Sequence, residues 1–154
     1  MENFINTFSQ YPRTVRTAFI TFVAAWCWHY FSLYMYFLKG EVPIEQIAIG
    51  LMLFISLVLF KKWGRILSIV FNSLAIIWYL WLTSQFMFAD KQSLITVAMV
   101  NVVLFGLSAL YLFHKNTAAF FKLMAEKKEK EKAQEIEEHV KNSALLRKRK
   151  KKDK

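Results

Sequence analysis

Residues 43–83 read PIEQIAIGLMLFISLVLFKKWGRILSIVFNSLAIIWYLWLT, two apolar runs joined by a short basic segment. The runs are Pro43–Phe60 and Ile66–Thr83, and neither carries a charge in its apolar interior. A helix on the surface of a soluble protein would show a polar face, and these runs show none. The connection KKWGR, residues 61–65, is only about five residues long, so we expect antiparallel neighbouring helices. This pattern is typical of a membrane hairpin.

Two further apolar stretches flank the hairpin, Thr17–Leu38 before it and Leu94–Phe113 after it. A bilayer core takes about 20 helical residues, which the outer stretches match, while the inner two need flanking residues to reach the interface. We therefore predict an all-α membrane protein with four transmembrane helices and a helical, basic cytoplasmic tail. The expected parts are an N-terminal segment 1–16, spans near 17–38, 43–60, 66–83 and 94–113 within a domain 17–113, and a charged tail 114–154.

The composition has the same division into an apolar body and a charged tail. Apolar residues make up 56% and aromatic residues 17% of the 154 positions. Ordinary soluble domains hold about 45–50% apolar residues. Of the 21 Lys and Arg, 14 lie from Lys115 onward, as do 7 of the 11 Asp and Glu. A soluble globular domain is therefore excluded.

The charges of the short connections predict the orientation. Two arginines precede Thr17, the segment KKWGR holds three basic residues and no acid, and the tail is strongly basic. The connections at 39–46 and 85–92 each hold a single Lys together with acidic residues. Because basic loops stay in the cytoplasm, we expect both termini and the KKWGR segment on that side.

The basic segments are candidate contacts for lipid headgroups. Long Lys and Arg stems lie along helix ends and hold their charges at the interface, and Trp63 is a natural interfacial anchor. The candidates are Lys61, Lys62, Trp63, Arg65, Arg147, Lys148, Arg149 and Lys150. The basic end of the tail lacks aromatic residues for base stacking, so we expect membrane lipid rather than nucleic acid as its partner.

An aromatic run, WCWHYFSLYMYF, fills residues 26–37. With the N-terminus inside, it covers the outer half of the first span, where an aromatic belt belongs. Trp26, Tyr30, Tyr34 and Phe37 recur at helical spacing and form one ridge. We expect this ridge to pack against a neighbouring helix or a partner protein.

His29 is the one ionisable residue deep in a span, which makes it a functional candidate. We expect a neutral imidazole hydrogen-bonded to a neighbouring hydroxyl or carbonyl group. No cofactor is predicted. Haem is the alternative to weigh, but His114 lies about 18 Å away in depth, so a second ligand would have to come from a partner or a symmetric copy.

Asn72 and Asn101 are buried amides that commonly join transmembrane helices, at about 1 kcal/mol each. They lie about 9 Å and about 18 Å from the cytoplasmic end and so form no obvious single site. Gly50 and Gly106 are isolated glycines, and we expect both to mark close helix contacts.

Several chemistries lack their usual residues in this sequence. No HExxH, GxSxG, P-loop or GxGxxG pattern occurs, and no span has an interior Asp, Glu, Lys or Arg. The single cysteine, Cys27, builds neither a disulfide nor a thiolate metal site within one chain. We therefore expect no enzymatic activity and no ion-coupled antiport.

The tail contains AEKKEKEKAQEIEEHVKNSALL at 125–146, which is rich in strong helix formers. Its apolar side chains fall on one narrow stripe made of Ala133, Ile136, Val140 and Ala144. The stripe is too short for a sustained coiled coil, but it is long enough to dock on a partner.

Two segments carry a family resemblance. KKWGRILSIVFNSLAI at 61–76 resembles the second-to-third-span junction of small, uncharacterised bacterial four-span inner-membrane proteins with a K-x-W-A-R-x-L-A-I pattern. ALYLFHKNTAAFF at 109–121 is similar to their fourth-span ending, which continues into N-P-x-V-x-x-F. Here Gly64 replaces the usual Ala, and the proline is absent. The resemblance implies a bacterial inner membrane and this topology, and no particular activity.

Together these features favour a non-catalytic subunit or scaffold of a larger membrane assembly, docked through its aromatic first span and its basic tail. Its partners would be lipid and other membrane subunits, or further copies of itself. The alternative is a homo-oligomeric channel or carrier for a small solute or ion, lined by His29, Asn72 and Asn101 of several copies. A redox subunit that shares haem through His29 is a third hypothesis.

Overall fold

The computed structural model describes residues 8, 10–37, 41–89 and 91–152, with side chains as far as Ile136. Helices dominate this part of the chain, and no strand occurs in it. The elements are α2 (Arg13–Ser32), the π-helical turn η1 (Leu33–Phe37), α3 (Ile44–Val58), α4 (Lys62–Phe88), α5 (Gln92–Phe113) and α6 (Lys115–Lys152). The predicted all-helical fold is confirmed.

Three of the described helical segments are long and apolar enough to cross a membrane: Arg13–Phe37, Lys62–Phe88 and Gln92–Phe113. Helix α3 is apolar but has only 15 residues, or about 22 Å of rise, against about 30 Å of bilayer core. Of the four expected spans, three therefore have a helix of sufficient length.

The helices begin and end where the backbone chemistry requires it. Pro12 and Pro43 precede the first residues of α2 and α3, since proline lacks an N–H and cannot sit inside a helix. Glu45 places a negative charge in the first turn of α3, at the positive end of the helix dipole. Extended backbone at His114, with ψ 136°, separates α5 from α6 and lets α6 take a new direction.

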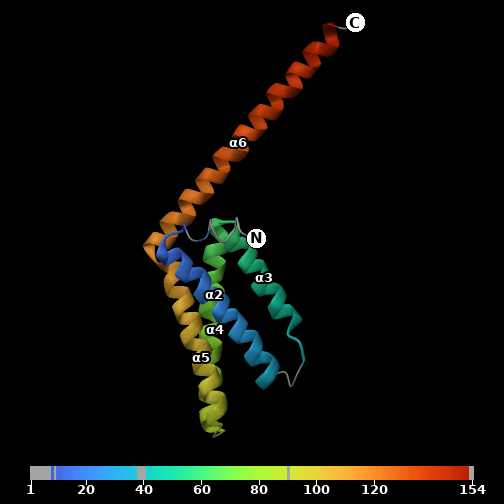
Figure 1. The fold of residues 1–154 in the computed structure, drawn as a ribbon. Helices are drawn as coiled ribbons and strands as arrows, with labels where there is room; N and C mark the ends of the chain where they lie inside the picture. Colours follow the sequence, from blue (N-terminus) through green and yellow to red (C-terminus); the bar gives the residue numbers. More distant parts are fainter. Residues whose placement is uncertain (1–7, 9, 38–40, 90, 153–154) are drawn as a thin grey trace.

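Helix α5 packs against both α2 and α4, while α3 diverges from α4 and α5 with distance from the α3–α4 turn (Figure 1). The larger apolar side chains of the core are Phe19, Phe22, Trp26, Leu53, Leu57, Phe60, Tyr79, Phe105, Leu112 and Phe121. On the outside, Ile77, Trp81 and Leu110 are more than half exposed. An outer surface this apolar suits hydrocarbon rather than water as its solvent.

Three parts of the chain meet at one end of the bundle, which we call the junction end (Figure 1). They are the start of α2, the α3–α4 turn and the α5–α6 break. The ring of Tyr11 lies 5.6 Å from that of Phe60 and 5.1 Å from that of Phe120. Successive helices therefore alternate in direction, and α6 leaves the bundle from this end.

The helix bounds differ from the expected spans in two places. Helix α4 has 27 residues and continues to Phe88, into the segment we expected to be a connection. The α3–α4 connection is residues 59–61 and is shorter than the expected five residues, because KWGR already belongs to α4. The expected antiparallel neighbours are present, joined by a tighter turn.

The glycines divide into close contacts and open space. A Cβ on Gly50 would overlap the Tyr30 hydroxyl, so the expected close contact is confirmed there. The same expectation is wrong for Gly106, where an added Cβ would meet nothing within 4 Å. Gly64 is a second close contact, because its Cβ would overlap Ser56 Oγ and lie 2.7 Å from Ser56 Cβ. Helix α4 touches α3 at this position.

Candidate functional site

His29 is buried in the interior of the bundle and pairs with a tyrosine of α4. Its Nδ1 lies 2.8 Å from the Tyr79 hydroxyl, so one of the two atoms donates a hydrogen bond to the other. Edge contacts to Trp26 and Phe105, with centroids 5.6 and 5.5 Å away, enclose the imidazole. The hydrogen bond to a hydroxyl that we expected from the sequence is present. It joins α2 to α4.

The two interior asparagines also join helices, at separate places. Asn72 Nδ2 of α4 donates to Ser108 Oγ of α5 at 2.9 Å. Asn101 Nδ2 of α5 donates to Ser32 Oγ of α2 at 3.0 Å. Both asparagines are fully buried, and neither contacts His29 through a described hydrogen bond. The Asn72 link stands apart, whereas Ser32 ties the Asn101 link to His29, because its hydroxyl also donates to the His29 carbonyl at 3.2 Å.

Most of the aromatic ridge of the first span packs inside the chain. Trp26 is buried, and the Tyr30 hydroxyl donates to the Gln46 carbonyl of α3 at 3.1 Å. The π-helical turn η1 shifts the register after Ser32, and Phe37 then packs on α4 with its ring 6.0 Å from that of Phe86. Tyr34 stays 42% exposed and faces outward.

A small groove opens between α3 and α4, where these helices diverge. Its volume is about 260 Å³, and Trp26 and His29 lie at its floor. Its walls come from Gln46 and Ile49 on one side and from α4 side chains such as Trp78 on the other. Apart from the polar atoms of Trp26, His29, Gln46 and Trp78, the lining of the groove is apolar, and lipid acyl chains would fill it.

Among the described residues, His29 is the one buried histidine. No group of three or more His, Cys, Asp or Glu side chains comes together among the described residues. The His29 Nδ1 is bonded to Tyr79, which leaves Nε2 as its ring nitrogen for a ligand, and His114 is exposed, with its Nδ1 accepting the Asn116 N–H at 3.2 Å. A haem bound through His29 would need its second ligand from another chain.

The junction end is built around an unusual turn at Phe60. The Lys61 N–H donates to the Ser56 carbonyl at 3.1 Å, and the Phe60 N–H donates to the Leu57 carbonyl at 2.9 Å. These paired bonds form a Schellman helix end, in which the left-handed residue is usually glycine. Phe60 occupies that position with φ 53°. Left-handed backbone costs a non-glycine residue about 1–2 kcal/mol.

Aromatic packing offsets this strain. The Phe60 ring is surrounded by four others, with centroids between 5.4 and 6.3 Å away. The neighbours are Tyr11, Phe19, Phe120 and Phe121. An aromatic pair contributes about 0.5–1.5 kcal/mol beyond its buried area. The turn between α3 and α4 is thereby fastened to the first turns of α6.

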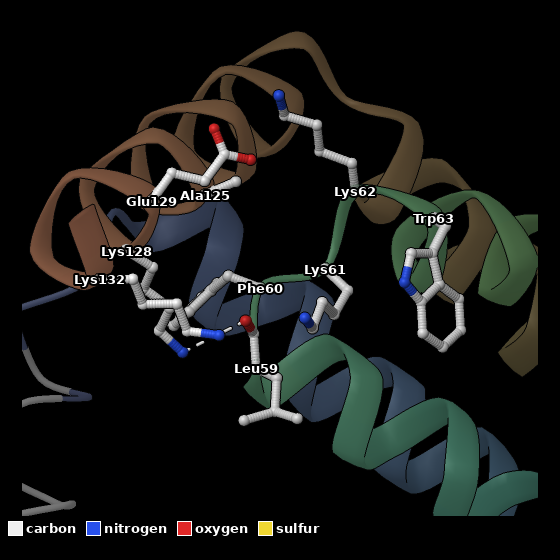
Figure 2. A pocket seen from close by; sticks show the side chains of 9 residues that line it. All are labelled: Leu59, Phe60, Lys61, Lys62, Trp63, Ala125, Lys128, Glu129 and Lys132. Carbon is white, nitrogen blue, oxygen red and sulfur yellow. Dashed lines mark hydrogen bonds between the residues drawn. The ribbon is translucent and has the colours of Figure 1, made fainter. Parts of the chain in front are cut away.

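A cleft of about 500 Å³ lies between this turn and α6, and we call it the junction cleft (Figure 2). Its lining residues are Leu59, Phe60, Lys61, Lys62, Trp63, Ala125, Lys128, Glu129 and Lys132. Lys128 Nζ donates to the Leu59 carbonyl at 3.2 Å and lies 5.5 Å from the centre of the Phe60 ring. This lysine places its charge at the negative end of the α3 dipole.

The structure brings part of the predicted headgroup set together. Lys61, Lys62 and Trp63 line the junction cleft. Arg65 lies on the next turn, where its guanidinium donates to the Leu112 carbonyl at 3.1 Å and joins α4 to α5. The side chains of the other candidates, Arg147, Lys148, Arg149 and Lys150, lie outside the described residues.

Sequence reasoning missed Lys128 and Lys132, which complete the cleft. Their spacing of four residues places them on one face of a helix, and this was the available signal. The spacing does not show that Lys128 and Lys132 face the α3–α4 turn, because their position relative to that turn depends on the angle at which α6 leaves the bundle.

Comparison with known proteins adds no relative. No protein-family model matches the chain, and no curated protein or solved structure is significantly similar to it.

Proposed function

We propose that this protein is a non-catalytic integral membrane scaffold that holds α6 at the membrane surface as a docking element for other subunits of a membrane assembly. The observation that carries this proposal is α6 itself. The helix has 38 residues, and every described residue from Glu129 to Ile136 is exposed. The described part of α6 beyond its base is polar and exposed, and an exposed helix of this kind is suited to contact another protein.

The root of α6 is fixed, which distinguishes it from a loose tail. Thr117 and Phe121 are essentially fully buried in the junction end. The Phe120 ring packs on Tyr11 and Phe60, with centroids 5.1 and 5.6 Å away. A helix held at its base in this way presents its far part in a defined direction, which lowers the entropy lost when a partner binds.

Helix α3 supplies the fourth crossing in this proposal. It starts away from the junction end, short of the level of the α4–α5 turn, and finishes in the junction end (Figure 1). Its helical rise of about 22 Å, together with residues 41–43 before it, approaches the thickness of the hydrocarbon core. The chain then crosses four times, and both termini lie on one side.

The charges at the two ends support a cytoplasmic junction end. Lys61, Lys62 and Arg65 lie there, together with the base of the basic tail. The described connections at the opposite end contribute Glu41, Glu45 and Lys91. The positive-inside rule then places both termini in the cytoplasm, and the family resemblance of the KKWGR segment points to a bacterial inner membrane.

In this proposal the tail, rather than the first span, provides most of the docking surface for a partner. Trp26, Tyr30 and Phe37 are engaged within the chain, which leaves little of the first-span ridge for a partner. On α6, by contrast, Ile136 is 65% exposed and belongs to the apolar stripe expected from the sequence. The side chains of Val140 and Ala144, which would continue the stripe, lie outside the described residues.

The channel hypothesis needs His29, Asn72 and Asn101 to line a path. In one copy these side chains are bonded inside the bundle to Tyr79, Ser108 and Ser32. A path lined by them would require these helix contacts to open, so the geometry favours the scaffold.

Native mass spectrometry of the tagged protein, extracted in mild detergent from its own host, tests the proposal. We expect foreign subunits in fixed stoichiometry. They should be lost with Ile136→Asp and retained with Gln134→Asp, a neighbouring exposed position off the stripe. A closed ring of identical copies whose solute flux falls with His29→Ala would overturn the scaffold in favour of the channel.

A further inference from the structure

Positive charge gathers in the junction cleft without a matching acid. Lys61 and Lys62 enter it from the α3–α4 turn, and Lys128 and Lys132 enter it from α6 (Figure 2). Glu129 is the one acidic residue in the lining. Among the described residues, no ion pair joins these lysines to an acid. The ion pair found there is Lys127–Glu131 at 3.9 Å, and it lies outside the lining of the cleft. Four lysines against one glutamate leave the lining with an excess of positive charge, which favours a bound anion.

A second cleft of about 480 Å³ begins on the other side of Lys62. It adds the charges of Arg65 and Lys122. The rest of its lining is Ile66, Ala118, Ala119 and Phe121, all apolar. Basic groups therefore lie directly beside an apolar surface, as they do wherever a protein meets a phospholipid.

We propose that the junction cleft binds the phosphate of an anionic phospholipid headgroup, with lysines of the α3–α4 turn and of α6 on either side of it. The bound phosphate bridges the two elements and holds α6 at one angle to the bundle. This inference does not depend on which protein α6 docks with.

The position of the cleft fits a headgroup better than a soluble anion. Trp63, half exposed at its rim, is the kind of residue that sits at the membrane interface. The apolar outer face of α4 begins directly below it with Ile66, which is 55% exposed. A phosphate in the cleft would thus have its acyl chains beside a lipid-facing helix.

The backbone of α4 adds donors to the same wall. Helix α4 begins at Lys62, and no side chain caps its first turn. The first N–H groups of a helix have no acceptor within the helix and favour an anion. Together with the four lysines, they form a site of the size of one headgroup rather than a long groove for a nucleic acid strand.

The test is native mass spectrometry of the full-length protein in detergent, titrated with phosphatidylglycerol or phosphatidylcholine. We expect retention of phosphatidylglycerol and little of phosphatidylcholine. The double variant Lys128→Gln with Lys132→Gln should bind phosphatidylglycerol about 25-fold more weakly, from about 1 kcal/mol for each lysine. The matched control is Lys127→Gln with Lys130→Gln, which removes equal charge from α6 outside the cleft and should leave binding within about twofold of the wild type.

Three results would overturn the proposal. They are equal retention of the two lipids, equal weakening by both double variants, and displacement of the lipid by inorganic phosphate at the same concentration. The second pair Lys61→Gln with Lys62→Gln repeats the test from the α4 side if the α6 variant does not fold, as judged by circular dichroism and gel filtration.

The bridging role has its own readout. Spin labels at positions 96 and 133, in a Cys27→Ser background, report the distance from the far end of α5 to α6. Phosphatidylglycerol should narrow this distance distribution in the wild type and leave it unchanged in the Lys128 and Lys132 double variant. Lipid binding without any narrowing in the wild type would show that the phosphate does not hold α6.

Discussion

The pairing of His29 with Tyr79 shows how single residues specify this bundle. In hydrocarbon neither side chain has water as an alternative partner, so a lost hydrogen bond leaves a buried polar atom unsatisfied. The pair joins α2 to α4 across 50 positions of sequence. A role in packing accounts for the histidine without a bound cofactor.

Replacing Tyr79 by Phe removes the partner of His29 and should destabilise the protein by about 1 kcal/mol. The measurement is unfolding by SDS titration in mixed micelles. Adding His29→Phe to this variant should recover part of the loss, because no unpaired polar atom then remains. Tyr36→Phe, at a 45% exposed position, is the matched control and should change nothing. Equal effects of the two tyrosine variants would contradict the interpretation.

Phe60 combines a strained backbone with a buried ring, and two substitutions separate these effects. Both Phe60→Ala and Phe60→Gly lose the ring contacts, a loss of about 3–5 kcal/mol. Glycine avoids the left-handed strain at φ 53°, so Phe60→Gly should be more stable than Phe60→Ala by about 1 kcal/mol. The same SDS titration measures the difference.

The helical residue Leu57 provides the control for this comparison. There the order should reverse, with the glycine variant about 1 kcal/mol less stable than the alanine variant. If alanine were the better residue at both positions, the left-handed turn at Phe60 would be refuted.

At the scale of elements, α3 depends on a few close contacts. It meets α4 where Gly64 faces Ser56, and it meets α2 where Gly50 faces Tyr30. Beyond these points it diverges and leaves the groove between α3 and α4. The two glycines thus set how closely α3 approaches the rest of the bundle.

Gly64→Ala should cost about 1–3 kcal/mol of stability, because the new methyl group overlaps Ser56 and forces α3 away from α4. Gly106→Ala makes the same chemical change where there is open space and should stabilise α5 by up to about 1 kcal/mol. Thermal unfolding in detergent compares the two variants. The packing at Gly64 would be refuted if Gly64→Ala were as stable as the wild type.

At the scale of the whole molecule, the alternating helices bring the basic segments to one end. The α3–α4 turn and the α5–α6 break are far apart in sequence, yet Phe60 and Phe121 pack ring to ring at 5.4 Å. The same packing holds the α3–α4 turn against α6, and the junction cleft lies between these two elements. The proposed orientation in the membrane and the proposed lipid site therefore both depend on this packing.

Cysteine labelling in a Cys27→Ser background tests this arrangement. A membrane-impermeant thiol reagent added to intact cells should label Glu41→Cys and Lys91→Cys. It should label Lys115→Cys only after the membrane is opened, because the proposed orientation places the junction end on the cytoplasmic side. Labelling of Glu41→Cys and Lys91→Cys from opposite sides would mean that α3 and α4 do not have the proposed arrangement.

The expected features that the structure confirms are those fixed by local sequence. Apolar runs without a polar face predicted the helices, and their breaks fall within a few residues of the expected positions. The turn was harder to predict, since Phe60 stands where a helix end usually has glycine and the sequence gives no local sign of it. Gly106 was predicted to mark a close contact between helices and does not, because a glycine by itself does not show which residues lie opposite it.

Composition and periodicity determined that this is an all-helical membrane protein. Whether a helix is apolar enough to lie in lipid depends on the residues of that helix alone. Composition and periodicity also predicted the hydrogen bonding of His29 and of the asparagines, because a buried polar group must find some partner. Only the tertiary structure decided which partner each one has, that the aromatic ridge mostly packs inward, and that Lys128 and Lys132 meet the α3–α4 turn. These outcomes depend on the angles between helices, and side chains far apart in sequence set those angles jointly.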